Sequence, residues 1–116
     1  MWNIETTDLF DSWFESLDDT DRGSVLAAML ALNARGPMLP RPYADTIKGS
    51  KYANMKELRV QSKGDPIRAF FVFDPRRHGI VLCAGHKAGN EKRFYQIMIP
   101  LADEEYRKHL QKLQQE

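Results

Sequence analysis

The chain has 116 residues, of which 42% are apolar and 28% charged, with a formal net charge of +1; this suits one domain, residues 1–116, of ordinary globular composition. No apolar stretch approaches the roughly 20 residues of a bilayer-spanning helix, and the acidic N-terminus lacks the basic region of a signal peptide, so we expect a cytoplasmic protein that does not use a membrane. Cys83 is the only cysteine, which excludes an intrachain disulfide and a Cys-based zinc site.

Residues 1–36 predict a short strand followed by a helical hairpin. Met1–Glu5 reads as the strand, and Thr7 is a suitable N-cap for the first helix. Asp18–Asp21 ends that helix and caps the second, which Gly36-Pro37 stops. Each helix has one apolar stripe at helical spacing. The stripes consist of Phe10, Trp13, Phe14 and Leu17 in the first helix and of Val25, Met29 and Leu32 in the second, with Leu26 and Leu30 alongside.

The middle of the chain predicts strands. Residues 37–54 contain three prolines and are expected to be irregular. From Met55 the apolar period becomes two, and turn signals at residues 63–66 and 74–79 separate two further strands, Ile67–Phe73 and Ile80–Ala84. In the strand after Met55, one face carries Leu58 and Val60 and the other carries Glu57, Arg59 and Gln61.

The last segment, from about Pro100 to Gln114, predicts a C-terminal helix. The element order is therefore β-α-α-β-β-β-α. We predict the α+β class, an antiparallel sheet with an N-terminal αα-hairpin and a C-terminal helix, all helices covering one face of the sheet.

The small net charge hides an asymmetry along the chain. Residues 1–33 carry seven acidic side chains and one basic one, a charge of −6, whereas residues 48–93 carry eleven basic and four acidic ones, a charge of +7. This division predicts a basic face for a polyanion and an acidic helical layer behind it. Solvated charges on strand faces and turns explain the same numbers equally well.

Arg68 stands out because it interrupts an otherwise apolar strand, where an unpaired charge is costly to bury. Either it reaches solvent or an acidic partner, or it lies on an open sheet face and binds a phosphate through two hydrogen bonds. Arg59 projects from the neighbouring strand. If the two faces align, two guanidinium groups flank one concave surface.

A dense group of functional side chains follows the last strand. His86, Lys87, Lys92, Arg93 and Tyr95 lie within ten positions. Cleavage of RNA without a metal needs a base for the 2′-hydroxyl, an acid for the leaving 5′-oxygen and cations for the phosphorane charge. These residue types supply all three. His86 could act as base or acid, and the sequence leaves that assignment open.

Other enzyme classes find little support. No HExxH, CxxC or His/Asp cluster indicates a metal site, so the expected metal set is none. No GxxxxGK[ST] or GxGxxG motif indicates a nucleotide cofactor, and no nucleophile elbow is present. We expect no cofactor.

Several segments together resemble the phage-derived Gp49-like/HigB branch of the RelE/ParE superfamily of type II toxin–antitoxin toxins. The resemblance runs from about Gly36 to Leu110 and covers most of the chain. Its segments are Gly36-Pro37, Arg41–Ser50, Asn54–Val60, Arg68–Arg77, Gly85–Tyr95 and Met98–Asp103, with Tyr106 and His109-Leu110.

The resemblance implies a microbial-ribonuclease-like RelE fold and a metal-independent endoribonuclease that cleaves mRNA on the ribosome by 2′-hydroxyl attack and inhibits translation. It implies three kinds of partner: the ribosome with its mRNA, a helix-turn-helix antitoxin of the HigA type, and operator DNA reached only through that antitoxin. Residues with an implied catalytic role are Arg68, His86, Lys87, Lys92, Arg93 and Tyr95; RNA or phosphate binding is expected of Lys56, Arg59, Arg76 and Arg77.

Two alternatives remain open on the same fold. A ParE-like toxin would act on gyrase by protein binding, although that branch lacks the catalytic groups of residues 86–95. A non-catalytic member would only join a toxin–antitoxin repressor complex. Glu57 favours this second alternative, because many of these toxins carry a lysine pair where this chain has Met55-Lys56-Glu57.

Overall fold

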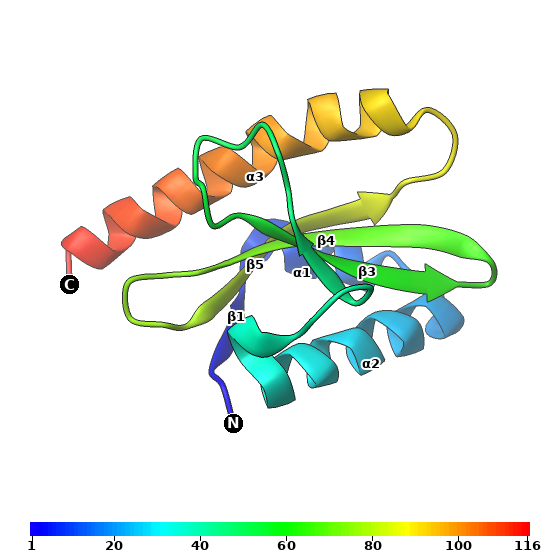
Figure 1. Ribbon diagram of the computed structural model, residues 1–116, viewed down its shortest axis with the longest axis horizontal. Helices are drawn as coiled ribbons and strands as arrows, with labels where there is room; N and C mark the ends of the chain where they lie inside the picture. The colour runs from blue at the N-terminus through cyan, green and yellow to red at the C-terminus, as the bar shows by residue number, and fades with distance from the viewer.

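The computed structural model describes residues 1–116 and contains a five-stranded sheet between two layers of helix (Figure 1). The sheet order is β1-β5-β4-β3-β2. In chain order the elements are β1 (Ile4–Thr6), α1 (Asp8–Glu15), α2 (Asp19–Arg35), a 3₁₀ turn η1 (Gly36–Met38), β2 (Ala44–Thr46), β3 (Lys56–Ser62), β4 (Asp65–Phe73), β5 (Gly79–His86) and α3 (Glu91–Gln114).

The predicted α+β class and the element order are confirmed, with one strand added. Strand β2 lies in the segment expected to be irregular and pairs antiparallel with the first residues of β3. The sheet is also not wholly antiparallel, because β1 pairs in parallel with β5. Such a three-residue edge strand after a helical crossover leaves no sequence signal of its direction.

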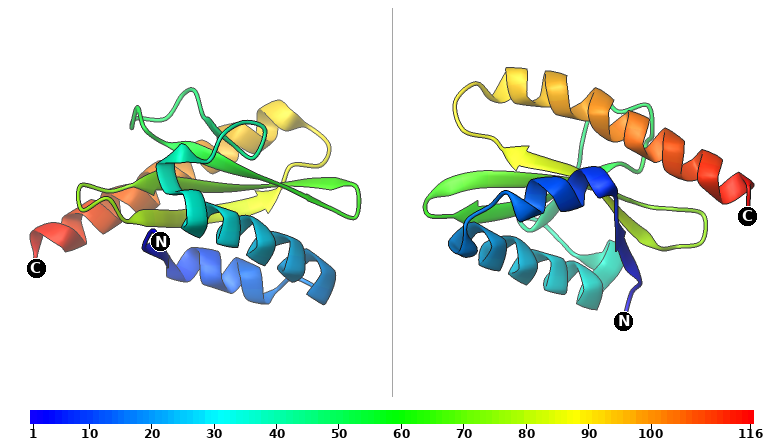
Figure 2. Two further views of the ribbon diagram at one scale, coloured as in Figure 1. Left: turned by 60° about the horizontal axis from the view of Figure 1, so that its bottom comes forward. Right: turned by 180° about the vertical axis from the view of Figure 1, so that it is seen from behind.

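The expectation that all helices cover one face of the sheet is wrong. Helices α1 and α2 pack on one face and α3 packs on the other (Figures 1 and 2). Alternate residues of β4 point to opposite faces, and both sets are buried: Ile67, Ala69 and Phe71 on the α2 side, Phe70 and Val72 on the α3 side. A strand that is apolar throughout needs cover on both faces.

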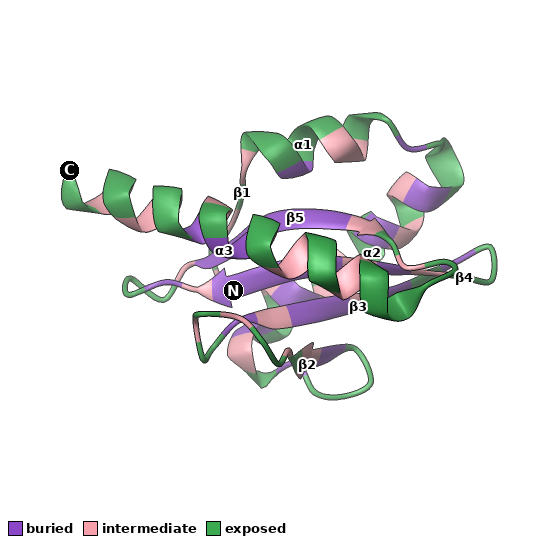
Figure 3. Cartoon of the chain, turned by 90° about the horizontal axis from the view of Figure 1, so that it is seen from above, coloured by how far each residue is buried: buried purple, intermediate pink, exposed green.

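Figure 3 shows the consequence for burial: the central strands are buried for most of their length, while each helix exposes its outer side. No helix is both long and apolar enough to span a bilayer.

The helix starts explain why the N-terminal hairpin was predictable and the last helix was not. Thr7 caps α1, its hydroxyl accepting from Phe10 N at 3.1 Å, and Asp18 caps α2, its carboxylate accepting from Asp21 N at 2.8 Å. Helix α3 begins at Glu91, with Asn90 as its cap, and runs through Pro100. The predicted start at about Pro100 is therefore wrong by nine residues, because Pro100 lies inside the helix although proline is usually confined to a first turn.

Candidate functional site

Strands β3 and β4 bring the predicted arginines together on the α3 side of the sheet. Arg59 lies directly opposite Arg68 in the antiparallel register. The alternation of the strands puts Glu57 on this same face, two positions before Arg59. The faces of the two strands therefore do align, so that both guanidinium groups lie on one side of the sheet with a carboxylate beside them.

Glu57 is the centre of the group, and its side chain is only 6% exposed. Its Oε2 accepts from Arg59 Nε at 3.0 Å, and its Oε1 accepts from the Tyr95 hydroxyl at 2.6 Å. Arg68 Nε lies 4.0 Å from the same Oε1. Asp45, on β2, receives a further hydrogen bond of 3.3 Å from Arg59 Nη2. The Glu57 carboxylate is thus approached by side chains from β3, β4 and α3.

These contacts fix the protonation of the neighbouring groups. The hydrogen bond to Glu57 raises the pKa of Arg59 above its ordinary value. Burial, together with the hydrogen bond to Glu57, raises the pKa of the Tyr95 phenol. Tyr95 is therefore a hydroxyl donor that orients the carboxylate and not a phenolate at neutral pH.

Arg68 keeps donors for a further anion. Its side chain is 12% exposed, Nη1 donates to Ile67 O at 3.0 Å, and the buried Nε has no hydrogen-bond acceptor. A guanidinium has five N–H donors, so most of those on Arg68 are uncommitted. An oxyanion placed above Arg68 could be held by two parallel hydrogen bonds.

Lys87 joins this group from the loop after β5, and the two other basic residues of that segment do not. Lys87 Nζ lies 5.9 Å from the centre of the Tyr95 ring and 3.1 Å from Glu91 Oε1. Lys92 and Arg93 lie in the first turn of α3 and are exposed. Lys92 lines a hollow beside Tyr95, whereas the exposed Arg93 side chain has no hydrogen bond or ion pair.

The prediction that His86 belongs to the same cluster is wrong. His86 is opposite Ile67 in the sheet and therefore faces α2. Its Nε2 lies 3.3 Å from Asp21 Oδ2, and its ring lies 6.1 Å from that of Trp13. Asp21 also accepts from the Ser62 hydroxyl at 2.6 Å, which lowers the pKa of Asp21. His86 thus helps to join α2 to the sheet.

Three predicted phosphate-binding residues also lie elsewhere. Lys56 faces the α2 side and its Nζ is 3.5 Å from Pro37 O. Arg76 and Arg77 belong to the loop between β4 and β5, at the far end of β4 from Arg68. Arg76 pairs with Asp74 at 2.9 Å and with Glu5 at 3.2 Å, and the Arg77 guanidinium lies over the Trp2 ring. Of the four predicted residues, only Arg59 is in the cluster.

Glu57 is the residue that the sequence interpretation undervalued. The period-two pattern already put it on the face of Arg59, and that alternation was the available signal. A hollow of about 360 Å³, lined by Thr46, Ile47, Lys48, Glu57, Tyr95 and Ile99, reaches its carboxylate from outside. Across the molecule no group of three or more His, Cys, Asp or Glu side chains is placed to hold a metal ion.

The fold and the site define a small α+β protein in which paired arginines and a buried carboxylate of the sheet meet a tyrosine of the C-terminal helix. The chain belongs to the family described as phage derived protein Gp49-like, whose sequence pattern matches residues 12–107. The resemblance found from the sequence is thereby confirmed.

Two relatives come from Mycobacterium tuberculosis. The chain is 43% identical over 100 residues to "Putative toxin HigB2", a match that covers 85% of this chain and 50% of that protein, so the chain spans about half its length. It is 45% identical over 94 residues to "Putative toxin HigB3", and this match covers 81% of each chain.

Proposed function

We propose that this protein is the toxin of a type II toxin–antitoxin pair and an endoribonuclease that cleaves mRNA on the ribosome without a metal. Its family and the names of its relatives support the toxin assignment. The observation that carries the nuclease is the contact of one carboxylate, Glu57, with Arg59 at 3.0 Å and its approach to Arg68 at 4.0 Å. A general base beside two phosphate-binding cations is what RNA cleavage requires.

In this mechanism Glu57 takes the proton of the 2′-hydroxyl, whose oxygen attacks the adjacent phosphorus. The bond from phosphorus to the 5′-oxygen breaks and leaves a 2′,3′-cyclic phosphate and a 5′-hydroxyl. Arg68, with its uncommitted donors, and Arg59 bind the non-bridging oxygens as charge develops on them. The Lys87 ammonium protonates the departing 5′-oxygen, and Tyr95 keeps Glu57 in place.

The test is primer extension on a translated reporter mRNA after brief induction without antitoxin. We expect cuts in phase with codons for the wild type and for the control Lys112→Ala, whose side chain is exposed at the far end of α3, and their loss in Arg68→Ala. Intact mRNA with arrested growth and DNA-damage signalling would instead favour a ParE-like gyrase inhibitor.

One observation favours a second function, a non-catalytic member of a repressor complex. Glu57 and Asp45 already pair with Arg59, and Glu57 approaches Arg68, so the network also serves as an internal ion-pair cluster that joins β2, β3 and β4. Normal growth on strong induction of folded protein would support this reading.

We further propose that a cognate helix-turn-helix antitoxin of the HigA type neutralises the protein and carries it to operator DNA. The relatives' names as toxins support an antitoxin partner. Co-expression with a small helix-turn-helix protein encoded by a neighbouring reading frame tests this: the pair should purify together and growth should recover.

A further inference from the structure

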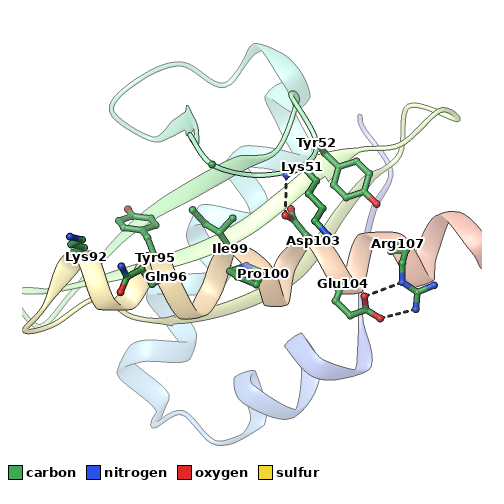
Figure 4. A pocket seen from close by; sticks show the side chains of 11 residues that line it. Lys51, Tyr52, Lys92, Tyr95, Gln96, Ile99, Pro100, Asp103, Glu104 and Arg107 are labelled. Carbon is green, nitrogen blue, oxygen red and sulfur yellow. Dashed lines mark hydrogen bonds and ion pairs between the residues drawn. The ribbon is translucent and has the colours of Figure 1, made fainter.

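A second hollow, of about 530 Å³, lies between α3 and the segment that follows β2 (Figure 4). Tyr95 and Ile99 line both this hollow and the one that reaches Glu57, so the two adjoin along α3. The second hollow extends from Lys92, in the first turn of α3, past Pro100 to Arg107. The open surface beside the candidate site is therefore longer than one phosphodiester needs.

The wall opposite α3 is firmly anchored. Buried Asp103 accepts from the Ser50 hydroxyl at 2.5 Å and from Lys51 N at 3.0 Å. Tyr52 packs edge-on against Tyr106, with ring centres 4.7 Å apart. These contacts hold the Ser50–Tyr52 segment against the helix, so the hollow is preformed and a ligand would not have to order this wall.

The charged side chains that line the hollow are three basic ones, Lys51, Lys92 and Arg107, and two acidic ones, Asp103 and Glu104, so its net charge is +1. Glu104 is paired with Arg107 at 2.7 Å, and both oxygens of Asp103 accept from neutral donors of the wall. The ammonium groups of Lys51 and Lys92 have no hydrogen-bond or ion-pair partner, and neither has that of Lys48 in the adjoining hollow. Uncommitted cations beside apolar Ile99 and Pro100 suit a ligand with both anionic and flat apolar parts.

We propose that this hollow binds the single-stranded RNA next to the cleaved phosphodiester. Lys92 and Lys51, towards opposite ends of the hollow, each contact a different flanking phosphate, and a base between them lies against Ile99 and Pro100. The strand then reaches the Glu57 site past Tyr95. This inference rests on the proposed nuclease function and adds to it a binding subsite for the substrate. Single-stranded RNA is the occupant because its bases are free to leave the stack and contact protein.

The test is fluorescence anisotropy with a labelled eight-nucleotide RNA, measured over a range of salt concentrations, with 2′-O-methyl groups to prevent cleavage. Each lysine–phosphate contact on a single strand contributes about −0.7 to the slope of log K against log salt. We expect the double variant Lys51→Ala/Lys92→Ala to bind at least about tenfold more weakly, with a slope less negative by about 1.4.

The matched control is Lys108→Ala/Lys112→Ala, which removes two lysines from the same helix outside the hollow. It should bind like the wild type, and thermal unfolding should show both variants folded. The subsite is wrong if the two double variants bind equally well, or if the wild type does not bind this RNA at low salt. A wild type that binds RNA but leaves translated mRNA intact would contradict the nuclease and leave the subsite standing.

Discussion

Replacing Glu57 by glutamine tests the candidate site most directly. The amide is nearly isosteric and still accepts the Tyr95 hydrogen bond of 2.6 Å, but it cannot take a proton from a 2′-hydroxyl. If Glu57 is the general base, the variant folds and fails in catalysis. If Glu57 only neutralises Arg59 and Arg68, the variant frees both guanidinium groups, and RNA binding becomes stronger.

Two magnitudes follow from the geometry. A general base contributes about 10²–10⁴-fold, so the cleavage rate should fall at least about 100-fold, or about 2.7 kcal/mol. Removing one partner of a buried ion pair costs about 3–5 kcal/mol. Here Arg59 is 35% exposed and keeps Asp45, so we expect a smaller loss of unfolding free energy, about 2 kcal/mol, and a Tm lower by about 8 °C.

The assay is the rate of codon-phased cleavage in a reconstituted translation reaction, with thermal unfolding of the same preparations. The matched control is Glu105→Gln, because Glu105 is also an α3-side acid with an 11% exposed side chain and one ion pair, to Lys108 at 2.7 Å. Cleavage by the Glu57→Gln protein within about threefold of the control would refute the general-base role.

Three further predictions concern the scaffold. The Asp74 side chain is fully buried, and hydrogen bonds from His109 and other donors outweigh the cost of burial and lower its pKa. Asp74→Asn should therefore lower the free energy of unfolding by about 3 kcal/mol at neutral pH. In acid-unfolding curves this difference from wild type should shrink as the pH falls below about 3.8, because only the wild type loses the charged carboxylate. Gly36 has φ +56°, and a Cβ there would overlap the Trp2 ring, so Gly36→Ala should lose about 3 kcal/mol in urea unfolding; an unchanged midpoint would contradict this. Burial raises the pKa of the Cys83 thiol to about 12, so a thiol reagent at pH 8 should label it only after unfolding, and rapid labelling of native protein would show that the site opens.

Much of the scaffold was predictable because its signals are local. The caps at Thr7 and Asp18 and the apolar stripes of α1 and α2 depend on residues within one or two turns. The period-two pattern likewise predicted strand β3 and the face of the sheet on which Arg59 lies. What failed was non-local: the parallel pairing of β1 with β5 and the second helical layer depend on segments far apart in the chain.

The positions of the paired arginines on the sheet were predictable from the sequence pattern. Arg68 interrupts an apolar strand, and Arg59 alternates with the apolar residues of the neighbouring strand. The role of Glu57 was harder to predict, because a single acid on a basic face looks like a departure from the site when its contacts are unknown. Its importance comes from Tyr95, which lies 38 positions away in the sequence and on a helix that was expected to begin later.

Lys87 lies at the candidate site and His86 does not, because of one irregularity in the sheet. The register between β4 and β5 shifts between Phe70 and Phe71, so that Phe70 pairs with Cys83 and Phe71 with Val81. Leu82 is the extra residue of this bulge, and Leu82 and Cys83 consequently both pack on the α3 side. A shift of one residue exchanges the two faces for everything that follows.

Without the bulge, strict alternation from Ile80 would direct His86 towards α3 and Lys87 towards α2. With it, His86 meets Asp21 on α2, and Lys87 reaches Tyr95 at the candidate site. The sequence could not reveal the bulge, because Ile80–Ala84 is apolar at every position and shows no alternation to interrupt. The backbone of β5 therefore decides which side chain lies beside Tyr95 and Glu57: the Lys87 ammonium group lies there, and the His86 imidazole lies on the opposite face of the sheet.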